Sequence, residues 1–121
     1  MIPETPVPEE RRRRPRFPWS VSLRYASFET DEETQRAIRM ADTVDVSSAG
    51  VQLASREPIR TGAFLQVAVR LPDRTAPVIL LGKTRWCREE ESGGHRTGVE
   101  FLGHVDQAFV DAVDRVGAQP A

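Results

Sequence analysis

Short stretches of alternating apolar and polar residues recur along the chain, and turn residues separate them. One stretch runs from Trp19 to Tyr25 and another from Phe64 to Leu71. Because successive side chains of a β-strand point to opposite faces, this period of two is typical of half-buried strands. Turn-forming residues at 72–74 and 92–94 favour tight connections between such strands. The chain is therefore predicted to fold mainly as short antiparallel strands.

Further strands are predicted over three ranges: Gly50–Ala54, Pro77–Glu89 and His95–Leu102. Gly82 interrupts the second of these ranges, which indicates a bulge or a bend of a barrel. In the third, Val99 and Phe101 are expected to face the core.

The segment before these strands allows two interpretations. Thr30 and Glu33 match a capping box, which predicts a helix over 31–41. The alternative is a strand that begins near Gln35. We favour the strand, because four apolar residues keep a period of two: Ile38, Met40, Val44 and Val46.

The end of the chain has a different period. Asp106 can cap a helix in which Phe109, Val113 and Val116 recur at helical spacing, with Ala112 beside them. Six short strands followed by one amphipathic helix predict a mainly β fold, namely a small six-stranded antiparallel β-barrel with a C-terminal α-helix.

A chain of 121 residues fits one domain. We place this domain at residues 10–117, with an arginine-rich segment at 10–17. A proline-rich lead-in at 1–9, expected to be disordered, precedes it, and a short tail at 118–121 follows it.

Basic charge is concentrated in five arginines between residues 11 and 16. The formal net charge of the chain is −1, so the remainder carries −6 once that +5 is subtracted. The rest of the chain is therefore negatively charged and is not expected to bind polynucleotides, which need an extended basic surface.

The single cysteine excludes an internal disulfide and is compatible with a reducing cytosol. The apolar runs are far shorter than the ~20 residues of a spanning helix, and no signal-peptide pattern is present, so we expect a cytoplasmic protein without membrane insertion.

Two motifs carry candidate chemistry: the arginine cluster and the turn Asp45–Gly50. Guanidinium groups bind phosphates and the acceptor edge of guanine, and a carboxylate suits the N–H donors of guanine. Each motif also has a simpler interpretation. The arginines fit a solvated tail or a patch for RNA or anionic lipid, and the turn fits a hairpin whose Asp and Ser bond their own backbone. Their combination favours a small anionic guanine nucleotide as the ligand.

This combination resembles the PilZ family of cyclic di-GMP receptors. The resemblance rests on residues 10–17 (ERRRRPRF) and 45–51 (DVSSAGV), with weaker support from 82–86 (GKTRW) and 97–101 (TGVEF). It extends over about residues 10–116. It implies a bacterial signalling domain built as a six-stranded barrel with a C-terminal helix, in agreement with the pattern of strands.

The resemblance also implies which residues contact the ligand. Arg12 and Arg16 match the paired arginines that hold guanine and phosphates, and Asp45 matches the acceptor for the N–H edge of guanine. Arg11 and Arg13 are expected to supplement phosphate binding.

The resemblance also implies roles for two further residues, and residue type alone guides the expectation for three others. Ser47 matches the hydroxyl that completes the contact made by the carboxylate, and Gly50 matches the turn that lets the ligand approach the backbone. Trp86 is expected in the core or at the barrel rim, with ligand contact as an alternative. His95 and His104 have no third ligand near them in sequence, so no metal site is expected.

The function that the resemblance implies is a non-enzymatic cyclic di-GMP receptor or adaptor. It would change conformation on ligand binding and signal to a protein partner in motility, adhesion or secretion. No cofactor besides this ligand is expected, and the protein is expected to be a monomer or weak dimer. One alternative keeps the fold without the ligand: a protein–protein adaptor whose arginines contact an acidic partner. Another alternative is a nucleic-acid-binding barrel. It is disfavoured by the net charge of −6 outside the arginine cluster and by an expected lack of exposed aromatic side chains for base stacking.

Overall fold

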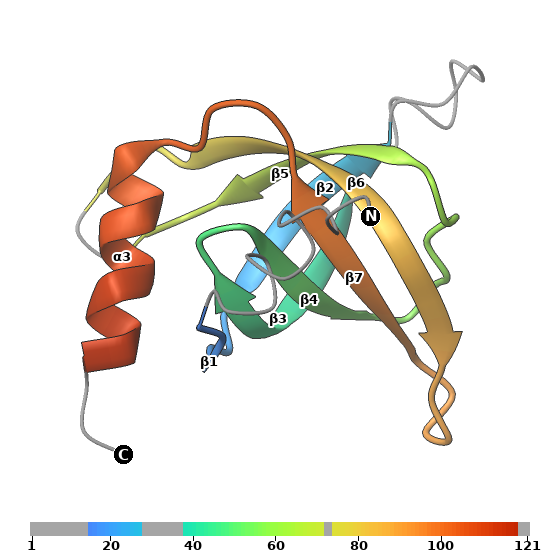
Figure 1. Cartoon of the computed structure of the whole chain (residues 1–121). Helices are drawn as coiled ribbons and strands as arrows, with labels where there is room; N and C mark the ends of the chain where they lie inside the picture. The colour runs from blue at the N-terminus through green and yellow to red at the C-terminus, as the bar shows by residue number, and fades with distance from the viewer. Residues whose placement is uncertain (1–14, 28–37, 72–73, 119–121) are drawn as a thin grey trace, which may run out of the picture.

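The structure, a computed structural model, describes residues 15–27, 38–71 and 74–118 (Figure 1). The predicted lead-in and most of the predicted tail lie outside the described residues. The elements follow in this order: β1 (Phe17–Pro18), β2 (Ser22–Ser27), β3 (Arg39–Ser47), β4 (Gly50–Ser55), β5 (Phe64–Val69), β6 (Val78–Glu89), β7 (His95–Phe101) and α3 (Gln107–Ala118).

The strands close into a barrel. β3, β2, β5, β6, β7 and β4 are hydrogen-bonded in that order, and β4 pairs back onto β3. Every one of these pairs is antiparallel. The two-residue strand β1 is added to β3. The predicted fold class is therefore confirmed: a closed six-stranded antiparallel β-barrel with one C-terminal helix.

The barrel interior is filled by the inward-facing apolar side chains of the strands. Val99 and Phe101 are buried, as predicted. The most completely buried side chains of the strands include Val46, Val51, Leu53, Leu65, Val67 and Val69. Along β5 these residues alternate with exposed or half-buried ones, so burial of one face stabilises both the strand and the closed barrel.

The first predicted strand is divided in two. Its second half forms β2, but Trp19 and Val21 lie in a gap between β1 and β2 and are only half-buried. Thr43 of β3 bridges this gap, because its hydroxyl accepts a hydrogen bond from the Val21 amide at 2.9 Å and donates one to the Trp19 carbonyl. Two backbone hydrogen bonds also join the gap to β3, from the Trp19 amide to the Val44 carbonyl at 3.1 Å and from the Thr43 amide to the Val21 carbonyl at 2.8 Å, and the threonine side chain supplements them.

The predicted faces of β3 were wrong in its first half. Ile38 and Met40 are 68% and 62% exposed, whereas Thr43 points into the barrel. A β-bulge between Thr43 and Asp45 then shifts the pairing with β4 by one residue. An extra residue reverses the faces of a strand, so Val46 is fully buried as predicted. The helix proposed over 31–41 is excluded at its described end, which lies in β3.

Gly82 does not carry the bulge that its position indicated. The register of β6 against β7 shifts between Thr84 and Trp86 instead. Gly82 is needed for space, because a Cβ there would lie 2.5 Å from the Val99 side chain. The bulge exposes Arg85 and Trp86, two consecutive residues, on the outside of the barrel.

Helix α3 covers one end of the barrel (Figure 1). The Asp106 side chain accepts a hydrogen bond from the Ala108 amide at 2.8 Å, which confirms the predicted cap. Phe109 is 1% exposed and meets Trp19 and Phe101 edge-to-face, with ring centroids 6.1 and 5.2 Å away. Phe109 therefore makes the central aromatic contact between the helix and the barrel, and Ala112 and Val113 of the helix are buried with it.

The last turn of α3 also contacts β1. A Cβ on Gly117 would lie 2.3 Å from the Phe17 ring, so this ring lies directly against the helix backbone. Phe17 follows the last arginine of the cluster. The helix thus holds the strand from which the arginine segment extends.

Candidate functional site

Asp45 is directed outward by the bulge in β3. Without the bulge, Asp45 would share the inward face of Thr43; the shifted register pairs it with Gln52 of β4 and leaves its side chain 26% exposed. The intervening residue, Val44, is half-buried. A carboxylate at this position accepts hydrogen bonds at a partly exposed site on the barrel wall.

Arg16 contacts this carboxylate directly. Its Nη2 lies 2.6 Å and its Nε 3.0 Å from the Asp45 Oδ1. The Gln52 amide nitrogen lies 3.4 Å from the other oxygen, Oδ2. The Arg16 side chain is 47% exposed, so we assign the ion pair only about 0–1 kcal/mol of stability. The structure thus brings together one residue from each of the two motifs.

Ser47 and Gly50 shape the turn between β3 and β4. The Ser47 hydroxyl is buried and accepts hydrogen bonds from the amides of Ala49 at 3.1 Å and Gly50 at 3.2 Å. A Cβ on Gly50 would lie 2.4 Å from the Val99 carbonyl oxygen, so glycine permits the close approach of β7. These are the backbone contacts that the hairpin interpretation predicts. A ligand contact for either residue stays a prediction.

β6 and β7, which lie beyond β4 in the barrel, form a wall next to Arg16 and Gln52. Trp86 is 38% exposed, and its indole covers Gly98, where a Cβ would lie 2.2 Å from the Trp86 Nε1. The Arg85 Nη2 pairs with the Glu100 Oε1 at 2.5 Å. The Arg88 guanidinium lies 5.3 Å from the centroid of the Trp86 ring, so this wall offers a partly exposed aromatic ring beside guanidinium groups and a carboxylate.

These groups surround a pocket of about 360 Å³. Its lining consists of Arg16, Ser47, Ala49, Gly50, Gln52, Arg85, Trp86, Gly98, Val99 and Glu100. The volume lies in the range of small-ligand sites, about 300–1,000 Å³. Of the predicted site residues, Arg16, Asp45, Ser47 and Gly50 lie in or beside this pocket. Arg11, Arg12 and Arg13 lie outside the described residues.

Sequence reasoning missed part of this wall. Gln52, Arg85 and Glu100 were not proposed as site residues, and Trp86 was expected mainly in the core or at the rim. Gln52 and Glu100 are outward-facing positions of predicted strands, and the two strands flank the Asp45–Gly50 turn. A prediction that those two strands pair with each other would have identified both residues as neighbours of the turn. The expected lack of exposed aromatic side chains was also wrong, because Trp86 and Phe64 are 38% and 48% exposed.

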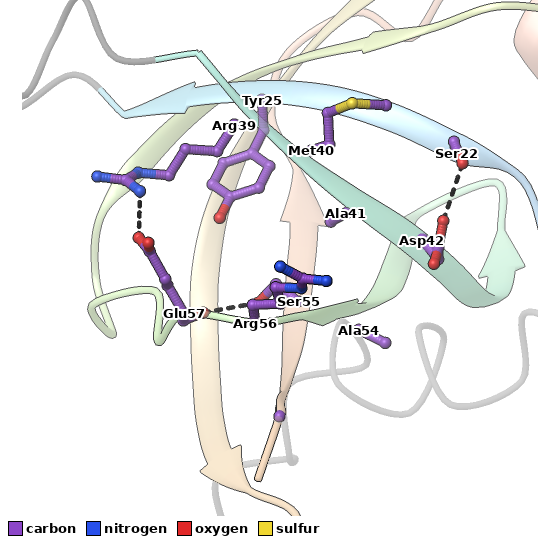
Figure 2. Close-up of a pocket in the computed structure, with 11 residues that line it drawn as sticks. Ser22, Tyr25, Arg39, Met40, Ala41, Asp42, Ala54, Ser55, Arg56 and Glu57 are labelled. Atoms are coloured by element: carbon purple, nitrogen blue, oxygen red, sulfur yellow. Dashed lines mark hydrogen bonds and ion pairs between the residues drawn. The ribbon is translucent and has the colours of Figure 1, made fainter. Parts of the chain in front are cut away.

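A second pocket, of about 590 Å³, lies where β3 and β4 diverge (Figure 2). Their pairing ends at Asp42 and Ala54. Figure 2 shows the Tyr25 ring in this gap, with Arg39 paired to Glu57 beside it. No described residue of the two ligand motifs lines this pocket. The smaller pocket is therefore the candidate ligand site.

Tyr25 provides a test of the packing in the second pocket. Burial raises the pKa of Tyr25 above its ordinary value of 10.0, and the nearby Arg39 charge opposes this rise in part. It is the only tyrosine of the chain, so the absorbance of tyrosinate reports on it alone. We expect tyrosinate to form at higher pH in the folded protein than in the denatured one.

The effect on stability follows from the same shift. The folded state holds the Tyr25 proton more tightly than the unfolded state. The resulting contribution to stability is fully present below the unfolded pKa, near 10.0, and is lost as the pH rises through the folded value. Alkaline denaturation of Tyr25→Phe should lack this contribution. Coincident titration curves for native and denatured protein would contradict the assignment.

The described residues contain no group of three or more His, Cys, Asp or Glu side chains placed to hold a metal ion. In the same part of the chain, α3 is too short and too polar to cross a bilayer, and no other helix qualifies.

A small β-barrel with a pocket lined by an aromatic ring, arginines and an outward carboxylate is the architecture of a ligand-binding domain. A family model for the PilZ domain matches residues 10–115, nearly the whole chain. The chain therefore belongs to the PilZ domain family, whose members serve as cyclic di-GMP-binding or adaptor domains rather than enzymes. No match to a curated protein was found.

Proposed function

We propose that this chain is a non-enzymatic cyclic di-GMP receptor domain that uses the pocket beside Asp45. The observation that carries the proposal is the contact between Arg16 and Asp45 at 2.6 Å. One residue comes from the arginine cluster and the other from the acidic turn, 29 positions later. A ligand that contains both phosphates and guanines has use for both groups at one site.

The chemistry of each group suits a different part of the ligand. The Asp45 carboxylate accepts hydrogen bonds from the N–H edge of a guanine. Arg16 offers a planar fork of donors to a phosphate or to the acceptor edge of guanine. Trp86 offers a face on which a base stacks, worth about 1–3 kcal/mol per base in other proteins. Arg11, Arg12 and Arg13 add positive charge for the two phosphates.

The Arg16–Asp45 pair occupies groups that the ligand needs. Because an exposed pair contributes only about 0–1 kcal/mol, its rearrangement opposes binding weakly. Each new charge-assisted hydrogen bond contributes about 1.5–3 kcal/mol, less the entropy lost when long side chains are ordered. Several such bonds together favour the complex.

Binding is proposed to act as a switch. The phosphates neutralise the arginine segment at 10–17, which then folds against the pocket and changes the surface around it. A protein partner in motility, adhesion or secretion reads the new surface. The contact of Phe17 with Gly117 supports a role for α3 in this change, because Phe17 is the next residue after Arg16.

Isothermal titration of the purified protein with cyclic di-GMP tests the proposal. We expect saturable binding, with GTP and cyclic GMP at the same concentrations as controls that bind much more weakly. Binding should weaken as salt is raised, because the contacts to phosphate are charged. If cyclic di-GMP gives no more heat than GTP while an acidic protein partner still binds in a salt-sensitive way, the ligand-independent adaptor is the better assignment.

A further inference from the structure

Exposed apolar side chains gather on the outer wall of the barrel, away from the ligand pocket. Met40, Phe64, Ile79 and Leu81 are 62%, 48%, 49% and 51% exposed. They come from β3, β5 and β6, and all point outward. Together with the half-buried Ala68 of β5, these residues form what we call the outer apolar face. A single exposed apolar residue is ordinary, but a contiguous set is typical of an interaction site.

The strand register shows how the set is arranged, with Arg24 and Gln66 interspersed among the apolar residues. Arg24 of β2 lies between Met40 on β3 and Ala68 on β5, and Ala68 pairs with Ile79 on β6. Leu81 is two residues further along β6, on the same side. Directly paired side chains of antiparallel strands lie about 4.5–5.5 Å apart at Cβ, so these residues adjoin one another. Figure 1 shows β2, β5 and β6 running together across the barrel.

The outer apolar face contains a hollow and a basic border. A pocket of about 290 Å³ is lined by Ser22, Leu23, Arg24, Met40, Ala68, Arg70 and Pro77. Among the described residues of this lining, the charged ones are both arginines. Lys83 lies 5.3 Å above the Phe64 ring at the other end of the face. Asp42, at the β3 border, accepts a hydrogen bond from the Ser22 hydroxyl. Within the described part of the chain, Arg24 has no acidic partner.

We propose that the outer apolar face is a docking surface for a partner protein that presents apolar side chains flanked by carboxylates. The hollow accepts one apolar side chain of the partner, as anchor pockets of interfaces do. Arg24, Arg70 and Lys83 then meet the flanking carboxylates, which gives the contact its specificity. None of the described docking residues lines the ligand pocket, and the two surfaces adjoin where Lys83 pairs in register with Glu100.

Two other occupants fit less well. A second copy related by a two-fold axis would place the same basic residues opposite one another, and like charges oppose that contact. An anionic lipid surface matches the basic border, but a fluid bilayer does not present a fixed side chain for the hollow. A separate acidic protein satisfies both features.

The test uses two fluorescent amphipathic peptides with the same leucines, one flanked by glutamates and the other by lysines. Fluorescence anisotropy with the full chain should show the glutamate peptide binding at least about tenfold more tightly, since opposite charges favour the complex. Arg24→Glu should remove this preference. Ile79→Thr keeps a β-branched side chain and should weaken binding of the glutamate peptide. Arg56→Glu makes the same charge change in the loop after β4 and should change nothing.

Several results would overturn the proposal. These are equal binding of the two peptides, an equal effect of Arg24→Glu and Arg56→Glu, or peptide-induced amide shifts in the NMR spectrum that avoid Ala68 and Leu81. Binding to phosphatidylserine vesicles that Arg24→Glu abolishes, without binding of the glutamate peptide, would assign the face to lipid. A dimer in sedimentation that Ile79→Thr dissociates, again without peptide binding, would assign it to self-association.

Discussion

Replacing Asp45 with asparagine should weaken cyclic di-GMP binding roughly 10- to 100-fold. The amide has nearly the shape of the carboxylate, but it lacks the charge that strengthens hydrogen bonds from a guanine edge. A charge-assisted hydrogen bond contributes about 1.5–3 kcal/mol, and each 1.4 kcal/mol is about tenfold in affinity. Isothermal titration measures the change directly.

Arg16→Ala should have an effect of at least the same size, because it removes a guanidinium that can offer two parallel donors to a phosphate. The unfolding free energy should fall by no more than about 1 kcal/mol in either variant, since the pair that they share is exposed. Denaturant unfolding therefore separates loss of binding from loss of folding.

Arg39→Ala is the matched control. Arg39 is 46% exposed and paired with Glu57, much as Arg16 is 47% exposed and paired with Asp45. The two substitutions change the net charge equally, but Arg39 lies at the other pocket. We expect near-normal affinity for Arg39→Ala. If both arginine variants lose the same affinity, general electrostatic attraction rather than a site at Asp45 explains the binding.

Phe109→Ala should lower the free energy of unfolding by about 3–5 kcal/mol, the usual loss for a fully buried phenylalanine. The side chain is 1% exposed, and its ring contacts Trp19 and Phe101. Its removal leaves a cavity between α3 and the barrel end. Urea unfolding, followed by tryptophan fluorescence, measures the loss.

Phe64→Ala removes the same atoms from a ring that is 48% exposed and provides the control. We expect this substitution to lower the free energy of unfolding by less than about 1 kcal/mol. Phe109→Leu should fall between the two and remain measurable if the alanine variant does not fold. Equal losses at positions 64 and 109 would show that α3 is not anchored by this contact.

Much of this fold is visible in local patterns. The alternation of apolar residues predicted the strands that became β4, β5, β6 and β7, and the helical spacing after Asp106 predicted α3. These patterns are reliable because each strand buries one face and exposes the other. The two ligand motifs were recognised in the same way, from residue types at short spacing.

The faces of β3 show where local patterns fail. Ile38 and Met40 follow a period of two, yet both are exposed, because the inward face of this half of the strand carries smaller or polar residues such as Thr43. The bulge after Thr43 then restores Val46 to the core. Apolar character alone does not say which face is buried when an exposed face has apolar residues of its own.

The candidate site also depends on β-bulges, at positions that local patterns did not predict. A bulge in β6 exposes Trp86, which lines the pocket, and a bulge in β3 places Asp45 against Arg16 and Gln52 of the same lining. The residues that complete the pocket, Gln52 and Glu100, come from β4 and β7. Neither lies in the arginine cluster or the Asp45–Gly50 turn, although Glu100 belongs to the 97–101 segment that supported the resemblance.

Side-chain period and turn chemistry are local properties, so the amino-acid order sufficed for the strands, the helix and the two motifs. The pocket, the Arg16–Asp45 contact and the outer apolar face required the folded chain. They arise from strand register and bulges, which are set by pairing between residues far apart in the sequence. A shift of one residue in that pairing moves a side chain from one face of a strand to the other.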